Sequence, residues 1–247
     1  MRQAMIFAAG LGTRLKPLTD IIPKALVKVG DKTLLERVIE ILKEAEIDEI
    51  VINVHHFAQL IKDFLKDNSN FGTDIRISDE SNMLLDTGGG LKKASSLFDG
   101  DGPILIHNVD IISNVNLNEF YERNKSFEAT LLVSSRKTSR YLLFDDNNRL
   151  VGWTNIQTGE VKSPYKDLNP DDCRLYAFSG IHLFSPSLFP MMQSFPDKFG
   201  IIDFYLSVCD EIEIHAEVKN DLRLMDVGKL DTLAQAEDFI LKNKRLF

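Results

Sequence analysis

Two glycines one residue apart, Gly10 and Gly12, directly follow a short apolar run at residues 4–9. The run predicts a buried first strand, and the glycines predict a turn whose backbone lies open to a close ligand. Successive N–H groups in such a turn can point at one phosphate group. Arg14 and Lys24 follow, one able to bind phosphate oxygens bidentately and the other a point charge. We therefore predict a polyphosphate-binding turn whose backbone cradle is formed by Ala9, Gly10, Gly12 and Thr13.

Other interpretations of this turn fit the residues less well. A Rossmann dinucleotide-binding turn needs a third glycine at position 15, where this chain has Leu15. A Walker loop needs Gly-Lys-Ser/Thr at its end, and that motif is absent. An ordinary strand-to-loop turn would not need the glycines, Arg14 and the pair Pro23-Lys24 together.

Residues 10–19, together with Pro23-Lys24, resemble the sugar-1-phosphate nucleotidyltransferases, whose pattern is Gly-x-Gly-Thr-Arg-Leu-x-Pro-Leu-Thr followed by Pro-Lys. Enzymes of this family combine a nucleoside triphosphate with a sugar 1-phosphate and release pyrophosphate and a nucleotide sugar. The resemblance implies these two small molecules as partners, Arg14 and Lys24 as catalytic residues, and Mg²⁺ as cofactor. A non-catalytic nucleotide-sugar sensor and a Rossmann oxidoreductase are the alternatives from other functional classes.

A second glycine cluster, Gly88-Gly89-Gly90, follows Asp86-Thr87. Here we predict a helix that begins at Leu91, and a helix N-terminus favours anions. The family resemblance implies that Gly88 and Gly89 face the nucleobase. This version of the segment most resembles the N-acetylmuramate 1-phosphate uridylyltransferases, which implies UTP and N-acetylmuramate 1-phosphate as substrates. Related guanylyltransferases carry a similar segment, so GTP with mannose or heptose 1-phosphate stays open.

Two aspartates far apart in the sequence follow predicted strand ends, where open α/β sheets bind ligands. Asp110 comes after the apolar run at residues 103–107, and Asp226 lies in Leu224-Met225-Asp226-Val227-Gly228. The resemblance implies that both bind Mg²⁺, an ion that takes one or two carboxylates with phosphate oxygens and water. Val109 replaces a glycine common in the family, which leaves the turn geometry open. Gly180, in a segment that resembles the family's sugar-side strand, is predicted to contact the sugar.

The charge distribution suits a small polyanion rather than a large one. The formal net charge is −8, yet residues 1–32 hold six Lys or Arg against Asp20 and Asp31, a net of +4. An acidic body argues against nucleic-acid and anionic-membrane partners, which need a basic surface. Cys173 and Cys209 lie far apart without metal-ligand spacing, which favours reduced thiols and a cytoplasmic location.

Strands and helices alternate along the first half of the chain, which predicts a Rossmann-like α/β fold with a mostly parallel sheet and helices on both faces. Residues 34–46 show helical periodicity after a predicted Thr33–Glu36 capping box. From about residue 140 the pattern changes to a β-hairpin and a polar excursion, a smaller β-rich insertion on the substrate side. We predict one nucleotidyltransferase domain over residues 1–247, with a nucleotide-binding half at about 1–135 and a sugar-binding half at about 136–247. The sequence leaves the oligomeric state open.

Overall fold

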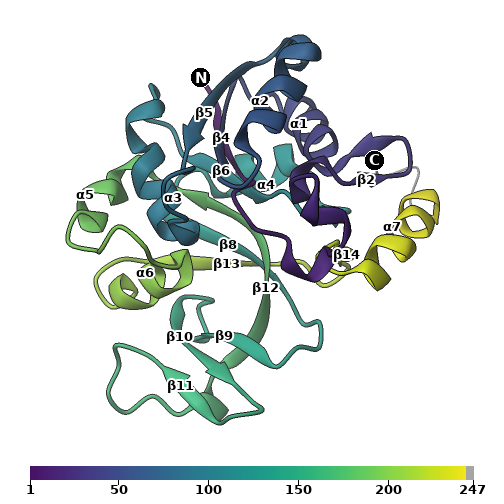
Figure 1. Ribbon diagram of the computed structural model, residues 1–247. Coiled ribbons are helices and arrows are strands. Elements are labelled where there is room, and N and C mark those ends of the chain that lie inside the picture. Colours follow the sequence, from purple (N-terminus) through teal and green to yellow (C-terminus); the bar gives the residue numbers. More distant parts are fainter. Residues whose placement is uncertain (243–247) are drawn as a thin grey trace.

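Four parallel strands form one side of the central sheet, out to its edge, in the computed structural model, which describes residues 1–242 (Figure 1). Their spatial order is β6 (Ile104–Asn108), β1 (Gln3–Phe7), β4 (Glu49–Val54) and β5 (Asp74–Asp79). The first three of these strands are apolar almost throughout and buried. Strands of a parallel sheet have this composition because both of their faces are covered.

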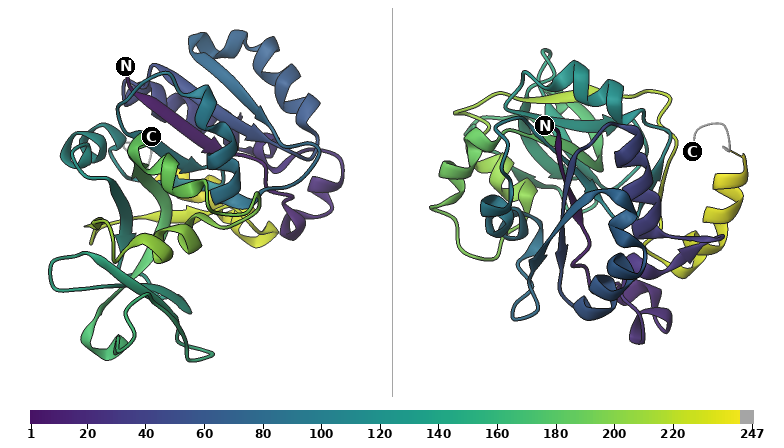
Figure 2. Two further views of the ribbon diagram at one scale, coloured as in Figure 1. Left: turned by 90° about the vertical axis from the view of Figure 1, so that its left-hand side faces the viewer. Right: turned by 90° about the horizontal axis from the view of Figure 1, so that it is seen from above.

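The long strand β12 (Arg174–Phe184) joins this parallel part to an antiparallel part. It pairs antiparallel with β6, with β8 (Ala129–Ser134) and with β9 (Arg140–Phe144). Strand β8 in turn pairs parallel with β13 (Ile214–Val218). The predicted hairpin is present as β9 and β10 (Leu150–Asn155), followed by β11 (Glu160–Lys162), and it projects from one end of the molecule (Figures 1 and 2). This mixed, helix-covered sheet confirms the predicted α/β fold class.

Helices cover both faces of the sheet, as the view from above in Figure 2 shows. Two apolar cores result, one on each face. One core contains residues of α1 (Leu34–Glu44), α2 (Ala58–Asp67), α4 (Leu117–Asn124) and α7 (Leu230–Lys242). The other contains residues of α3 (Asp86–Ala94), α5 (Phe189–Met192) and α6 (Ile201–Val208). Side chains of β1 alternate between the two, because successive residues of a strand point to opposite faces.

The capping box predicted at the start of α1 is confirmed. The Glu36 N–H donates to the Thr33 hydroxyl oxygen at 3.0 Å, and the Thr33 N–H donates to the Glu36 carboxylate at 3.4 Å. Short 3-10 helices occur between the larger elements, at Thr13–Leu15, Leu18–Asp20, Lys24–Leu26, Ser69–Gly72, Ser95–Leu97, Pro170–Asp172 and Pro186–Leu188.

The structure corrects two expectations about local elements. Helix α3 begins at Asp86 rather than Leu91, so the three glycines lie inside the helix. Two short antiparallel ribbons were not predicted: β2 (Lys28–Val29) with β3 (Lys32–Thr33), and β7 (Ile111–Ser113) with β14 (Leu224–Asp226). Strands of two or three residues are too short to carry a readable alternation of apolar and polar residues.

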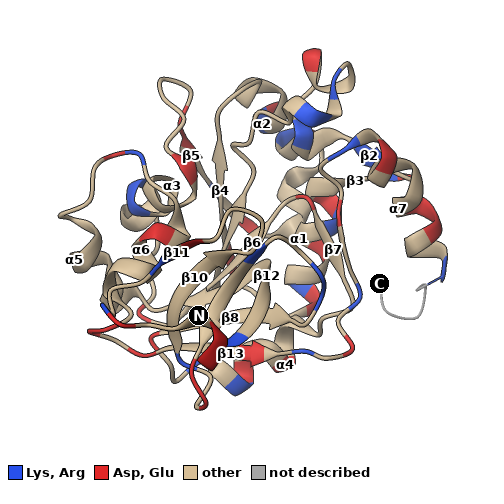
Figure 3. Ribbon diagram, turned by 90° about the horizontal axis from the view of Figure 1, so that it is seen from below, with Lys and Arg blue, Asp and Glu red and all other residues tan. Residues whose placement is uncertain are grey.

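Charged residues gather on the outer helices and on the connecting loops, including α1, α4 and α7 (Figure 3). The interior strands and the inward faces of the helices supply the two apolar cores instead. Within residues 1–242, no helix has the length and apolar character needed to cross a membrane.

Candidate active site

The turn after β1 contains Gly10 and Gly12, and its conformation requires glycine at position 12. Gly12 has a φ of +63°, and a Cβ there would lie 2.8 Å from the Thr19 side chain. The Gly12 carbonyl accepts hydrogen bonds from the Leu15 N–H and from the Thr19 hydroxyl, both at 2.8 Å. A Cβ on Gly10, by contrast, would meet nothing within 4 Å. The space beside the Gly10 backbone is therefore open to a ligand.

A buried polar network fixes the carboxyl ends of β1 and β4 beneath this turn. The Asn53 side chain accepts from the Ala8 N–H at 2.8 Å and donates to the Glu80 carboxylate at 2.7 Å. The same carboxylate accepts from the Leu85 N–H at 3.2 Å, just before α3. Burial raises the pKa of Glu80, and the hydrogen bonds from Asn53 and Leu85 oppose that shift. These hydrogen bonds connect the turn after β1 with the segment just before α3, so both are held in fixed positions at the ends of the strands.

The β7–β14 ribbon brings the two predicted metal-binding aspartates together. Asp110 directly precedes β7, and Asp226 ends β14 opposite Ile111. The Val227 N–H also donates to the Asp110 carbonyl at 2.8 Å. Val109, at the position that is glycine elsewhere in the family, is buried and donates its N–H to the Phe7 carbonyl at 3.2 Å. Valine is therefore compatible with this turn.

Opposite charges surround the two aspartates. Lys24 is 9% exposed and forms an ion pair with Asp110. Burial, and then the neighbouring Asp110 carboxylate, raise the pKa of Asp226, while Lys24 and Arg14 act to lower it. A Cβ on Gly228 would lie 2.6 Å from the Asp226 carboxylate and 2.7 Å from the Arg14 guanidinium, so both groups flank that glycine. Adjacent carboxylates of this kind are stabilised by a shared cation.

These carboxylates fit a hard divalent cation such as Mg²⁺, which prefers oxygen ligands. No group of three or more His, Cys, Asp or Glu side chains within residues 1–242 could hold a metal ion. A cation held by Asp110 and Asp226 would thus need further oxygens from substrate phosphates and water.

A cavity of about 410 Å³ opens above the carboxyl ends of the parallel strands. Its walls include Ala8, Ala9 and Gly10 from the turn, Lys24 and Asp110 from the charged cluster, and Asp86 and Thr87 from the start of α3. The Thr87 hydroxyl oxygen accepts from the Ile201 N–H at 2.9 Å, which leaves its own proton free to donate. The cavity thus offers backbone, a cation and hydroxyl or carboxylate groups to one ligand.

A second cavity of about 520 Å³ lies on the other side of the aspartates. Its walls include Arg14, Arg136, Phe178, Gly180, Asp226 and Lys229. Gly180 has a φ of +79°, and a Cβ there would lie 2.6 Å from the Asn108 side chain. Asn108 lines both cavities, so the two adjoin at the end of β6.

Two of the predicted nucleotide-binding residues lie behind the first cavity rather than in its wall. The N–H groups of Gly88 and Gly89 both donate to the Phe199 carbonyl, at 2.9 and 3.1 Å. A Cβ on Gly88 would lie 2.4 Å from the Phe199 ring, and one on Gly89 would lie 2.0 Å from the Asp197 carbonyl oxygen. These glycines let α3 approach the segment before α6, and Asp86 and Thr87 face the cavity in their place. Gly12 and Thr13 shape the turn without lining either cavity.

Several cavity-lining residues escaped the sequence prediction, namely Asn53, Asp86, Thr87, Asn108, Arg136, Phe178 and Lys229. Asn108 stands directly before Val109-Asp110 at a strand's carboxyl end, a position that could have indicated it. Arg136 comes from the connection between β8 and β9 and has no such local signal.

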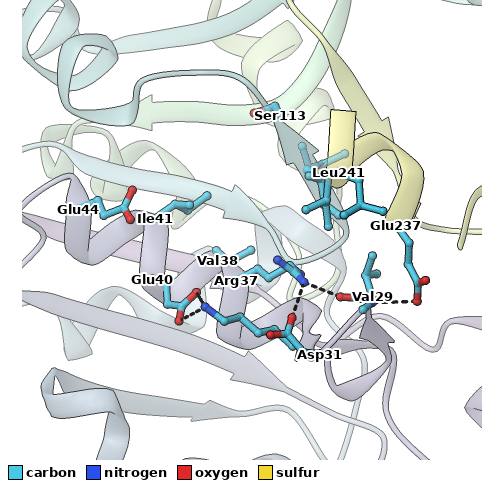
Figure 4. Close-up of a pocket in the computed structure, with 15 residues that line it drawn as sticks. Val29, Asp31, Arg37, Val38, Glu40, Ile41, Glu44, Ser113, Glu237 and Leu241 are labelled. Carbon is cyan, nitrogen blue, oxygen red and sulfur yellow. Dashed lines mark hydrogen bonds and ion pairs between the residues drawn. The ribbon is translucent and has the colours of Figure 1, made fainter. Parts of the chain in front are cut away.

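A third cavity, of about 490 Å³, lies away from the charged cluster (Figure 4). The β2–β3 ribbon, α1, β7 and α7 enclose it. Arg37 donates to the Val29 carbonyl at 2.5 Å and pairs with Asp31 at 3.3 Å, and the Gly30 N–H donates to Glu237 at 3.0 Å. None of the predicted site residues lines it.

The sequence matches the family model described as "Nucleotidyl transferase" over residues 3–243. It is 45% identical over 111 residues to an N-acetylmuramate alpha-1-phosphate uridylyltransferase of Caulobacter vibrioides, covering 44% of this chain and 46% of that protein. It is also 37% identical over 136 residues to a probable mannose-1-phosphate guanylyltransferase of Oryza sativa, covering 53% of this chain and 38% of that protein. The matched segments thus span less than half the length of either relative.

The fold has close counterparts among solved structures. A putative glucose-1-phosphate thymidylyltransferase from Bacillus anthracis superimposes with a TM-score of 0.80 at 18% identity, over 97% of this chain and 95% of that one. At this level of identity the likeness concerns the fold alone.

Proposed function

Because this chain belongs to the nucleotidyl transferase family, we propose that it transfers a nucleotidyl group from a nucleoside triphosphate to a sugar 1-phosphate. The observation that carries the proposal is the pair of adjoining cavities with the charged cluster between them. The first cavity suits a nucleotide and the second, with Arg14, Arg136 and Lys229 in its wall, suits an anionic sugar. A reaction between two bound phosphates needs this arrangement.

In the proposed reaction, an oxygen of the sugar phosphate attacks the α-phosphorus of the nucleotide. A new phosphorus–oxygen bond forms, the α–β bridging bond breaks, and its electron pair leaves with pyrophosphate. The second pKa of a phosphate monoester is about 6, so the attacking oxygen is mostly ionised at neutral pH and needs no general base. The task of the protein is alignment and neutralisation of charge.

Each charged residue then has a defined role. Lys24 neutralises charge at the α-phosphate. Arg14 lines the second cavity and lies beside Asp226, so we assign it to the phosphates where the two cavities adjoin, to stabilise the triphosphate and the departing pyrophosphate. The open backbone at Ala9 and Gly10 holds the nucleotide phosphates, and Gly180 lies against the sugar. Asp110 and Asp226 would hold Mg²⁺, which supplies charge neutralisation and orientation of phosphate oxygens when bound. The raised pKa of Asp226 and its proximity to Asp110 support this assignment.

We assign the nucleotide to the first half of the chain and the sugar phosphate to the second half. The nucleotide cavity is lined by residues before position 135, apart from Gly200. Most residues around the second cavity lie after position 135, although Arg14, Asn108 and Ile111 complete it. This supports a nucleotide-binding half at about 1–135 and a sugar-binding half at about 136–247. A nucleoside triphosphate substrate and the separate free cysteines Cys173 and Cys209 support a cytoplasmic location.

For the specific substrates we propose UTP and N-acetylmuramate 1-phosphate. The similarity to the Caulobacter vibrioides uridylyltransferase supports both. Asp86 and Thr87 border the nucleotide cavity and could accept the N3–H of uracil and donate to a uracil carbonyl, respectively.

The similarity to the Oryza sativa guanylyltransferase favours a second candidate, GTP with mannose 1-phosphate. A carboxylate such as Asp86 also suits the N–H groups of guanine, so the base-binding residues alone accommodate both nucleotides.

The test is a panel of UTP and GTP against N-acetylmuramate, mannose and heptose 1-phosphates, with pyrophosphate release as the readout. We expect the highest kcat/KM for UTP with N-acetylmuramate 1-phosphate. A preference for GTP would overturn the uridylyl assignment and leave the reaction class standing. Absence of pyrophosphate release with every pair would overturn the reaction class itself.

A further inference from the structure

A small outer cavity adjoins the sugar cavity and shares no lining residue with the nucleotide cavity. It has a volume of about 220 Å³ and shares Arg136 and Phe178 with the sugar cavity. One water occupies about 30 Å³ of liquid volume, so this space is large enough for a substituent of several atoms. Any group that projects from the bound sugar past Phe178 would enter it.

The walls of this outer cavity combine two arginines with apolar side chains. Arg136 and Arg140 supply the charge, and Leu142, Trp153, Phe178 and Ile202 supply the apolar surface. No Asp or Glu lines the cavity. A short apolar arm that ends in an anion is the chemistry that such walls recognise.

The two guanidinium groups keep most of their hydrogen-bonding capacity free. Arg136 donates one hydrogen bond, to the Phe178 carbonyl at 3.0 Å. The backbone N–H of Arg140 donates to the Thr138 hydroxyl at 3.4 Å, while its guanidinium lines the outer cavity without a hydrogen bond or ion pair to any residue in 1–242. A guanidinium has five N–H donors in a planar fork that matches a carboxylate. Both guanidinium groups line the same small cavity, so an anion bound there has two cationic partners.

We propose that Arg136 and Arg140 form a second anion-binding subsite, which selects acceptors that carry a carboxylate in addition to the 1-phosphate. The proposal rests on the proposed function, since it assigns the substrate class of that same site. N-acetylmuramate has such a group, a lactyl ether that ends in a carboxylate. Arg140 is the more selective probe because it lines the outer cavity alone, whereas Arg136 also lines the sugar cavity.

Two acceptors that differ only in this group make a matched pair. N-acetylglucosamine 1-phosphate lacks the lactyl ether and is otherwise the same sugar as N-acetylmuramate 1-phosphate. We expect the wild-type protein to prefer the acidic acceptor at least tenfold in kcat/KM. Arg140→Met should lower kcat/KM for the acidic acceptor by about tenfold or more, the scale of a lost hydrogen bond to a charged group, and leave the neutral one nearly unchanged.

The neighbouring residue Lys137 provides the matched control. It is exposed in the same connection and lines neither cavity, so Lys137→Met removes the same charge without touching the subsite. We expect its preference for the acidic acceptor to equal that of the wild type. Arg140→Lys should give an intermediate preference, because lysine keeps the charge and loses the planar fork.

Equilibrium binding of the two sugar phosphates, measured by calorimetry, separates this proposal from the reaction itself. If no acceptor supports turnover, the proposed function fails, while an affinity ratio that depends on Arg140 would still support the subsite. The subsite proposal would be overturned if the wild-type protein showed no preference for the acidic acceptor. It would also be overturned if that preference were unchanged in both Arg140→Met and Arg136→Met.

Discussion

Lys24 is the single residue whose position most directly serves the proposed chemistry. It is nearly buried, pairs with Asp110 and lines the nucleotide cavity. We expect Lys24→Met to lower the single-turnover rate by ~10²–10³, the scale for loss of one preorganised electrostatic partner. Lys28→Met, at an exposed position on β2, is the control and should react at the wild-type rate. A wild-type rate in a folded Lys24→Met protein would remove this residue from the mechanism.

Substitution of Asp110 or Asp226 should affect the Mg²⁺-dependent rate and the stability of the fold in different ways. Burial, and then repulsion by the Asp110 carboxylate, raise the pKa of Asp226, so the charged form of Asp226 is unfavourable in the folded, metal-free protein. We therefore expect Asp226→Asn to keep or raise the unfolding midpoint of the metal-free protein and to abolish the Mg²⁺ dependence of the rate. The measurements are a Mg²⁺ titration of turnover and a thermal melt with chelator.

Asp221→Asn is the control for this pair, because Asp221 is an exposed aspartate that pairs with Lys219. Its Mg²⁺ dependence should match the wild type. An unchanged Mg²⁺ dependence in both Asp110→Asn and Asp226→Asn would show that the metal ligands lie elsewhere.

At the scale of elements, two glycines with different surroundings predict opposite results. Gly88→Ala would drive a Cβ into the Phe199 ring inside the contact between α3 and the start of α6, and overpacking of this kind costs about 1–3 kcal/mol. Gly10→Ala adds a Cβ to open space and should leave the free energy of unfolding within about 0.5 kcal/mol, while it raises the KM for the nucleotide. Urea unfolding and steady-state kinetics measure both effects. Equal losses of stability in the two variants would contradict this distinction.

The contact between β6 and β12 contains two buried histidines, which gives the fold a pH dependence. Burial lowers the pKa of His107 to about 4 and that of His182 to about 3, against about 6.5 in an unfolded chain. The unfolded chain therefore binds more protons between pH 6.5 and pH 4. The stabilising effect of neutral histidines is complete above pH 6.5 and is lost as the pH falls through this range.

His182→Phe should reduce this acid sensitivity, because His182 lies among the rings of Phe7, Phe178 and Tyr205. From pH 7 to pH 5 we expect the variant to lose up to about 2 kcal/mol less stability than the wild type, measured by urea unfolding. The exposed residue His56 provides the control, and His56→Gln should follow the wild type. Parallel pH profiles for His182→Phe and the wild type would contradict the assignment.

At the scale of the whole molecule, the nucleotide cavity joins segments that lie far apart in the sequence. It is bordered by the ends of β1, β4 and β6 and by residues at the start of α3 and α6. Bound UTP with Mg²⁺ should therefore stabilise the entire fold, by about 2.7 kcal/mol at a hundredfold excess over Kd. For a chain of this size that corresponds to a rise of roughly 5–10 °C in Tm. A larger rise with GTP than with UTP at equal concentration would favour the guanylyl alternative.

The sequence by itself determined the features that depend on residues close together along the chain. The capping box of α1 closes over four consecutive residues, and the hairpin of β9 and β10 was readable from two apolar runs around a polar turn. The family was also evident locally, since the motif that resembles the family's pattern lies within residues 10–24. Interactions over such short distances depend on backbone preference and periodicity, which a single sequence displays directly.

Tertiary structure alone decided how distant segments meet. The β7–β14 ribbon sets Asp226 opposite Ile111, and α3 packs its glycines against Phe199 instead of exposing them to a base. Arg136 and Arg140 gained their place beside the sugar cavity only because β12 carries Phe178 next to the β8–β9 connection. Contacts of this kind depend on which distant segments of the chain pack against one another, and a local pattern of residues does not indicate this.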